Sequence, residues 1–289
     1  MPLEVLGFLL GLLFGSFLNV CISRLPEHRS VVKPRSHCPS CGQTIRWYDN
    51  LPLLSWLLLR RRCRDCKTAI SWRYPAVELA LGLWFAVCAG RTALEGVGVA
   101  TLGFLLIGLM VMDWQTQTLP NAFTLPGIVI GFLLVCVKAA FLAPGEGDIV
   151  LNTTRQLRMT SPGSFAARGN VFLTGTEAMV MGRIAAIVGA ALILLVVRWI
   201  YKALRKREGL GLGDVKLLAM IAAFLGFGES VLALFVGVLS ASLYGVFLIF
   251  RRGAVAETKL PLGSFLSAGG LLAALFGSRI IHWYTGLLR

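Results

Sequence analysis

The chain has 289 residues, of which 56% are hydrophobic and only 15% are charged, and its formal net charge is +14. A water-soluble domain would carry about 25% charged residues, so this composition excludes an ordinary soluble enzyme. The apolar residues form long uninterrupted runs, which is the pattern of membrane-spanning helices rather than of amphipathic surface helices.

Eight such runs predict an all-α polytopic membrane protein with about eight transmembrane helices. Their predicted bounds are Leu3–Ile22, Pro75–Gly90, Val97–Met112, Ala122–Leu142, Ala178–Tyr201, Val215–Gly228, Ser230–Phe250 and Leu262–Ile281. The second, third and sixth runs are shorter than the roughly 20 residues that cross a typical bilayer. Helices this short are expected to be covered by protein or to begin inside a hydrated cavity.

The positions of Lys and Arg predict the orientation of the chain in the membrane. Residues 23–74 contain eleven of them against three acids, residues 202–208 contain four, and residues 251–260 contain three. All three stretches fall on one side of an eight-span arrangement, and positive charge accumulates on the cytoplasmic side. We therefore predict a periplasmic N-terminus. The chain start lacks the basic region of a cleavable signal peptide, so the first run is expected to remain as an anchor.

This topology divides the chain into three predicted parts. They are a first transmembrane helix over residues 1–22, a cytoplasmic tetracysteine domain over 23–74, and a helix bundle over 75–289 with a periplasmic loop at 143–177. The basic stretches adjoin the spans, where membrane lipid headgroups explain them. No basic domain stands apart from the membrane, so we predict membrane lipid and no nucleic acid as a partner.

Four of the seven cysteines form two Cys-x-x-Cys pairs, close to the zinc-ribbon pattern. The pairs are Cys38 with Cys41 and Cys63 with Cys66, and 21 residues separate them. Each pair can aim two thiolates at one ion from a tight turn. Four Cys ligands leave no open position, so the predicted zinc would be structural. Two disulfides or four free thiols are the alternatives, although a reducing cytoplasm argues against disulfides.

Two aspartates stand at helix ends on the same predicted side of the membrane. Asp113 ends the third run, and Asp214 opens the sixth after Gly209-Leu-Gly-Leu-Gly213. Paired carboxylates suit peptide hydrolysis, because a protonated group can polarise the carbonyl while an ionised one activates water. The helix termini favour Asp214 as the base and Asp113 as the acid. Helix capping is the alternative role for each aspartate.

Together with further motifs, these residues resemble the bacterial type IV prepilin peptidases, a family of GxGD-type intramembrane aspartyl proteases. The further motifs are Gly15-Ser-Phe-Leu-Asn-Val, Trp47-Tyr-Asp-Asn-Leu-Pro-Leu-Leu-Ser-Trp56, Ile70-Ser-Trp-Arg-Tyr-Pro-Ala-Val-Glu78, Leu119-Pro-Asn121 and Gly211-Leu-Gly-Asp-Val-Lys-Leu217. Presenilin-like proteases share the Gly-x-Gly-Asp element, but the whole set, spread along most of the chain, is specific.

The resemblance implies an eight-helix enzyme of the bacterial inner membrane with Asp113 and Asp214 as its catalytic residues. It implies cleavage of type IV prepilins or type II secretion pseudopilins between a glycine and a phenylalanine. It also implies N-methylation of the new N-terminus by S-adenosylmethionine. Glu78 is the candidate residue for methylation, with an ordinary helix-start acid as the alternative. Family members often carry glycine two residues before the third cysteine, where this chain has Arg61.

Three other functions are compatible with parts of the sequence. One is a peptidase that lacks methyltransferase activity. Another is a transporter, in which paired acids bind cations, but transport predicts acids spread through the membrane thickness and often an internal repeat. The third is a non-enzymatic, zinc-stapled membrane scaffold, in which both aspartates only cap helices. Leader processing that survives replacement of both aspartates would favour the scaffold.

Overall fold

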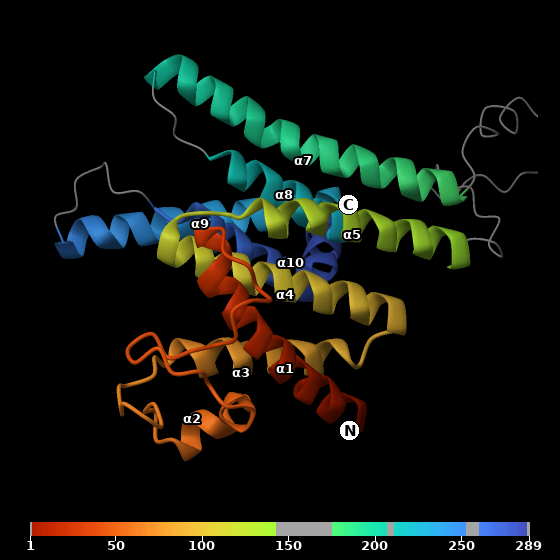
Figure 1. Cartoon of the computed structure of the whole chain (residues 1–289). Coiled ribbons are helices and arrows are strands. Elements are labelled where there is room, and N and C mark those ends of the chain that lie inside the picture. Colours follow the sequence, from red (N-terminus) through yellow and green to blue (C-terminus); the bar gives the residue numbers. More distant parts are fainter. Residues whose placement is uncertain (1, 143–174, 207–210, 253–259, 288–289) are drawn as a thin grey trace, which may run out of the picture.

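The computed structural model describes residues 2–142, 175–206, 211–252 and 260–287. Its long helices are α1 (Pro2–Arg24), α3 (Arg73–Cys88), α4 (Ala93–Thr116), α5 (Asn121–Leu142), α7 (Gly175–Arg205), α8 (Leu212–Leu225), α9 (Phe227–Arg252) and α10 (Leu262–Leu287). They form a bundle, and a small tetracysteine segment between α1 and α3 lies beside it (Figure 1). That segment contains η1 (Leu25–Glu27), η2 (Trp47–Asn50) and α2 (Leu54–Leu58).

The predicted all-α architecture is confirmed. Within the described residues, two isolated bridges are the only extended pairing, and each long helix corresponds to one predicted run. Six helices are long and apolar enough to cross a membrane, whereas α3 and α8 have only 16 and 14 residues. The predicted loop 143–177 lies outside the described residues except for its last three, which begin α7.

The prediction of a short third span is wrong. Helix α4 has 24 residues, because it continues past the apolar run at both ends. The additional residues at its far end are Asp113 to Thr116. An apolar run stops at the first polar side chain, whereas helical hydrogen bonding does not. Asp113 therefore lies within the last full turn of α4, not beyond the helix.

Helix α8 lies inside the bundle. It packs against α4, α5, α7, α9 and α10, and its residues from Val215 to Ala223 are almost all buried. Because protein rather than lipid surrounds it, its length need not match the thickness of the bilayer. This explains how a helix of 14 residues fits a membrane protein.

Helices α1 and α3 form the closest pair at the other side of the bundle. Gly7, Gly11 and Gly15 follow one face of α1 against the backbone of α3, and a Cβ added to Gly15 would lie 2.6 Å from Cα of Glu78. Small residues at this spacing allow membrane helices to approach closely. The contact fixes the start of α3 beside α1, close to where the tetracysteine segment leaves the bundle.

Candidate functional site

Asp113 lies where the end of α4 meets the start of α10. This residue is only 6% exposed, and its Oδ2 accepts hydrogen bonds from the backbone N–H of Ser264 at 2.7 Å and from the Ser264 hydroxyl at 3.0 Å. Ser264 belongs to the first turn of α10. The positive end of a helix dipole therefore faces the Asp113 carboxyl.

Asp214 occupies the first turn of α8 and is also buried. Its Oδ2 accepts a hydrogen bond from the N–H of Gly211 at 3.3 Å, so this carboxyl also caps its own helix. The carboxyls of Asp113 and Asp214 are close enough to interact electrostatically. The fold thus brings together the two aspartates singled out in the sequence.

Leu119 packs between two glycines at this site. A Cβ added to Gly213 would lie 3.0 Å from Cβ of Leu119, and one added to Gly263 would lie 2.9 Å from its Cδ1 and 3.0 Å from Cγ of Asp113. Both glycines are therefore required by close packing around Leu119 and Asp113. Neither Ser264 nor Gly263 was predicted as part of the site.

Lys216 points toward the start of α5 and not toward the aspartate pair. Its Nζ donates a hydrogen bond to Oδ1 of Asn121 at 2.8 Å. Asn121 is the first residue of α5 and follows Leu119 and Pro120. This contact holds α8 against the turn that carries Leu119.

Three aromatic rings border the contact between Asp113 and Ser264. Trp114 lies 5.7 Å from Tyr244 and 6.2 Å from Phe265 between ring centroids, and Tyr244 lies 5.4 Å from Phe265. Trp114 follows Asp113, and Phe265 follows Ser264. Trp114 is 54% exposed, so this aromatic cluster presents an apolar surface at the end of α4 that carries Asp113.

Glu78 lies apart from the aspartates, between α1, α3 and the loop before α2. Its buried carboxylate accepts a hydrogen bond from the N–H of Leu53 at 2.9 Å. Leu53 has a positive φ of 59° with ψ of −48°, a sparsely populated backbone conformation that costs a non-glycine residue about 1 kcal/mol or more. Glu78 thus holds the tetracysteine segment to α3, and its role in methylation stays a prediction.

The four predicted cysteine ligands meet at one point. Their Sγ atoms all lie within 4.8 Å of one another, and those of Cys38 and Cys66 are 3.7 Å apart. Tetrahedral zinc with Zn–S bonds of about 2.3 Å needs S···S distances of about 3.8 Å. The arrangement therefore fits a closed zinc centre with four thiolate ligands.

The two Cys-x-x-Cys turns have the same backbone pattern. The N–H of Cys38 donates to the Gln43 carbonyl, and the N–H of Gly42 donates to the Cys38 carbonyl, both at 2.9 Å. In the second turn, the N–H of Cys63 donates to Thr68 at 2.9 Å and that of Lys67 donates to Cys63 at 3.1 Å. Two matching turns can supply the two halves of one tetrahedron.

Hydrogen bonds also favour thiolates in two of the four positions. Thr68, through its side chain and its N–H, lowers the pKa of the Cys66 thiol to about 6. The N–H groups of Cys41 and Ser40 lower the pKa of Cys38. The N–H of Gln43 lowers the pKa of Cys41, but desolvation and neighbouring thiols raise it to about 11 in total. A shared cation would relieve this conflict, because metal ligands bind as thiolates.

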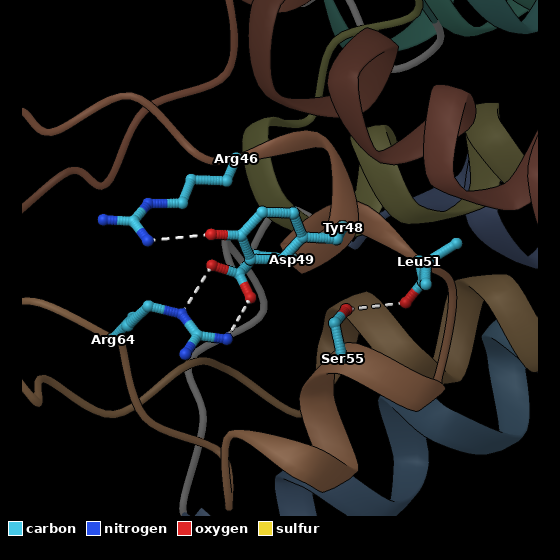
Figure 2. Close-up of polar contacts among 6 residues, drawn as sticks. All are labelled: Arg46, Tyr48, Asp49, Leu51, Ser55 and Arg64. Carbon is cyan, nitrogen blue, oxygen red and sulfur yellow. Dashed lines mark hydrogen bonds and ion pairs between the residues drawn. The ribbon is translucent and has the colours of Figure 1, made fainter.

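A bidentate ion pair links the second cysteine turn to η2 (Figure 2). Arg64, between Cys63 and Cys66, donates from Nε and Nη2 to the Asp49 carboxylate at 2.9 and 2.7 Å. The Arg64 guanidinium holds the pKa of Asp49 below its usual value. The stabilisation from this pair is therefore present above the unfolded pKa of Asp49 and is lost as the pH falls through its lowered folded value.

Arg61 adopts the backbone conformation that glycine adopts freely. Its φ is 63°, in the left-handed region that disfavours residues with a Cβ. Its carbonyl accepts the N–H of Ile70 at 2.7 Å, and its guanidinium lies 5.4 Å from the Trp56 ring centroid. The geometry explains why glycine suits this position, and the stacking on Trp56 offsets part of the cost of arginine.

Two family models match separate parts of the chain. The Bacterial Peptidase A24 N-terminal domain matches residues 9–92, and the Type IV leader peptidase family matches residues 158–246. The first range contains the four cysteines and Glu78, and the second contains Asp214. Asp113 lies between them.

Near full-length relatives agree with these matches. A protein of Aeromonas salmonicida (strain A449) is 32% identical over 98% of this chain and 94% of its own length. A protein of Aeromonas hydrophila is 33% identical over 96% of this chain and 92% of its own length. A protein of Burkholderia pseudomallei (strain 1026b) is 31% identical over 94% of this chain and 85% of its own length. All three are named prepilin leader peptidase/N-methyltransferase. No solved structure shows a significant match.

The fold and site define a class: multi-pass helical membrane proteins with paired buried aspartates and a tetracysteine centre. Within that class, the relatives and the family models place the chain clearly. It belongs to the type IV leader peptidase family.

Replacing one of the four clustered cysteines is expected to release zinc. We expect the purified protein to contain about one zinc ion per chain by elemental mass spectrometry, as a site with four thiolate ligands requires. Cys66→Ser should lose most of it. Cys136→Ser, at a free thiol of α5, is the matched control and should keep it. Two disulfides and no zinc in the wild-type protein would contradict the assignment.

Proposed function

We propose that this chain is a prepilin peptidase of the bacterial inner membrane. It removes the leader peptide from type IV prepilins or type II secretion pseudopilins, with Asp113 and Asp214 as the catalytic residues. The observation that carries the proposal is the convergence of these buried carboxyls, from α4 and α8, at one end of the bundle. Relatives of nearly the same length bear the name of this activity.

The site has the parts that peptide hydrolysis by an aspartate pair needs. One carboxyl must be protonated to polarise the scissile carbonyl, and the other must be ionised to remove a proton from the attacking water. Two close carboxyls do not both ionise easily, so the charge of one favours the protonated form of the other. The Ser264 N–H donates to Oδ2 of Asp113, and the single hydrogen of the Ser264 hydroxyl can bond either that oxygen or the Met110 carbonyl.

Which aspartate acts as the base stays a prediction. The position of Asp113 at the end of α4 favours it as the acid. The donors of Ser264 and the start of α10 oppose this argument, because they place positive dipoles beside the same carboxyl. A coupled pair titrates as one unit, so the pair and not either residue is the functional group.

The orientation we propose places the aspartates and the tetracysteine segment on the cytoplasmic side and the N-terminus in the periplasm. The distribution of Lys and Arg supports it. The zinc ion is structural in this proposal, because four thiolates leave no position for substrate. Membership of the peptidase family does not favour the transporter or scaffold alternatives.

We also propose N-methylation of the new N-terminus. S-adenosylmethionine would supply an electrophilic methyl group. A cavity of about 310 Å³ between the end of α1 and the tetracysteine segment contains groups that fit this cofactor. Arg24 and Arg35 can bind its carboxylate, and the face of Trp47 suits its sulfonium or its adenine. Glu78 would contribute indirectly, by holding the loop that follows Asn50.

Removing either carboxylate is expected to abolish cleavage. Asp113→Asn and Asp214→Asn should each lower kcat for a purified prepilin by about 1000-fold or more, since each removes an essential acid or base. Leader loss and methyl addition are read together by intact mass. Glu95→Gln, at the opposite end of α4, is the control and should keep activity. Cleavage that survives both aspartate substitutions would end the proposal.

Removing the Ser264 hydroxyl is expected to slow cleavage with little change in KM. A hydrogen bond to a charged group contributes about 1.5–3 kcal/mol, so Ser264→Ala should lower kcat by about 10-fold to 100-fold. Ser264→Thr should recover part of the loss. Ser267→Ala is the matched control, because this buried hydroxyl on the same helix has no hydrogen-bond partner within the described residues. Equal effects of the two alanine variants would show that Ser264 only fills space.

The aromatic cluster is expected to contact an apolar substrate side chain beside the scissile bond. Trp114→Ala should raise KM for a prepilin by about 10-fold, because it removes an apolar contact with the substrate. It should also abolish most of the preference for phenylalanine over alanine at the position after the cleaved bond. Trp283→Ala, an exposed tryptophan near the other end of α10, is the control. In a double-mutant cycle, Trp114→Ala in the enzyme is combined with a phenylalanine-to-alanine change in the substrate. Additive effects of the two changes on kcat/KM would rule out the contact.

A further inference from the structure

The tetracysteine segment has an apolar surface that neither the aspartate pair nor the thiolates use. It is formed by Leu54, Leu57 and Leu58 of α2, which are 58%, 63% and 81% exposed. Their spacing of three and four residues places them on one face of the helix. The polar neighbour Ser55 turns back and donates a hydrogen bond to the Leu51 carbonyl at 2.6 Å (Figure 2). A cluster of three exposed leucines on so small a segment indicates a binding surface.

A basic cavity of about 270 Å³ continues this surface from Leu58. Its cations are Arg60, Arg62, Arg64 and Lys67, and no acidic residue lines it. Asp49 neutralises Arg64 (Figure 2). Arg60, Arg62 and Lys67 take part in none of the ion pairs found among the described residues. The cavity therefore keeps positive charge that an anionic ligand can neutralise.

The same surface is held beside the start of α3, where the predicted run Pro75–Gly90 begins. Leu53, just before α2, donates its N–H to Glu78 in the second turn of α3 at 2.9 Å. Trp56, within α2, donates from Nε1 to the Ile70 carbonyl at 3.4 Å, three residues before α3 begins. Helix α2 consequently lies beside the start of α3 (Figure 1). The start of a membrane-spanning helix lies at the interface between the bilayer and water, so we expect α2 to lie at that interface.

We propose that α2 and the cavity of Arg60, Arg62 and Lys67 together bind an anionic phospholipid of the surrounding membrane. Leu54, Leu57 and Leu58 insert among the acyl chains, and the cavity holds the phosphate through guanidinium and ammonium donors. A zwitterionic headgroup carries its own ammonium, which this cationic cavity repels. Phosphatidylglycerol should therefore bind in preference to phosphatidylcholine, and the preference should fall as salt rises.

The preference can be measured on the full-length protein by native mass spectrometry with equal amounts of the two lipids. We expect Arg60→Gln/Arg62→Gln to lower retention of phosphatidylglycerol by about fivefold for each basic side chain removed. Lys33→Gln/Arg46→Gln removes the same charge from two exposed positions of the same segment that take part in none of the ion pairs found among the described residues, and should change retention little. Equal losses in both double variants would overturn the proposal, because net charge alone would then explain binding. Displacement of the lipid by millimolar inorganic phosphate would also overturn it.

Insertion of the leucines is tested separately in vesicles of phosphatidylglycerol and phosphatidylcholine. A photo-crosslinking residue introduced as Leu58→benzoylphenylalanine should form covalent adducts with phospholipid. The same residue introduced as Ser40→benzoylphenylalanine, at an exposed position in the first cysteine turn, should form few. Equal crosslinking at both positions, or none at residue 58 while the protein retains its zinc and its leader peptidase activity, would show that α2 does not enter the membrane.

Discussion

The hydrogen bonds that Ser264 donates to Asp113 determine the geometry on which the candidate active site depends. They join α4 to the first turn of α10, 151 residues further along the chain. A buried carboxyl needs donors, and the first turn of a helix has N–H groups with no partner inside the helix. Helix α10 must therefore begin at the depth where α4 carries Asp113. Helix α8 must begin there as well, and its enclosure by five other helices holds Asp214 in place.

The tetracysteine segment is connected to that geometry through α3. Glu78 binds the loop before α2, and Arg73, the first residue of α3, donates a hydrogen bond to Gln115 at 2.6 Å, two residues beyond Asp113. Contacts thus run from the thiol cluster through α3 to the end of α4. Gln115 and Asp113 lie between the ranges matched by the two family models, 9–92 and 158–246, so the end of α4 connects the first range to Asp214 in the second.

The sequence was enough to predict the helices and the paired aspartates, because apolar runs and the scarcity of charge in them are local properties. The thiol cluster was equally accessible from the spacing of Cys38, Cys41, Cys63 and Cys66. The role of Ser264 could not be predicted from the sequence, because serine is common at helix starts and its partner Asp113 lies 151 residues away in the chain. The length of α4 was mispredicted for a related reason. The apolar run ends at Met112, but the helix continues through Asp113 to Thr116. Asp113 is covered by α10 there, so this polar residue is compatible with the helix.

Proteolysis and methylation make opposite demands on the same amine. In the proposed reaction, cleavage by the aspartate pair releases the new N-terminus as an amine that takes up a proton, and an α-amino group has a pKa of about 8 even without a neighbouring carboxylate. Beside Asp113 and Asp214 it would be held as an ammonium ion, which has no lone pair to accept a methyl group. The amine must therefore leave the carboxyl pair before it can be methylated. A separate cavity, between α1 and the tetracysteine segment and lined by no acidic residue, meets that chemical requirement, whereas a single shared site would not.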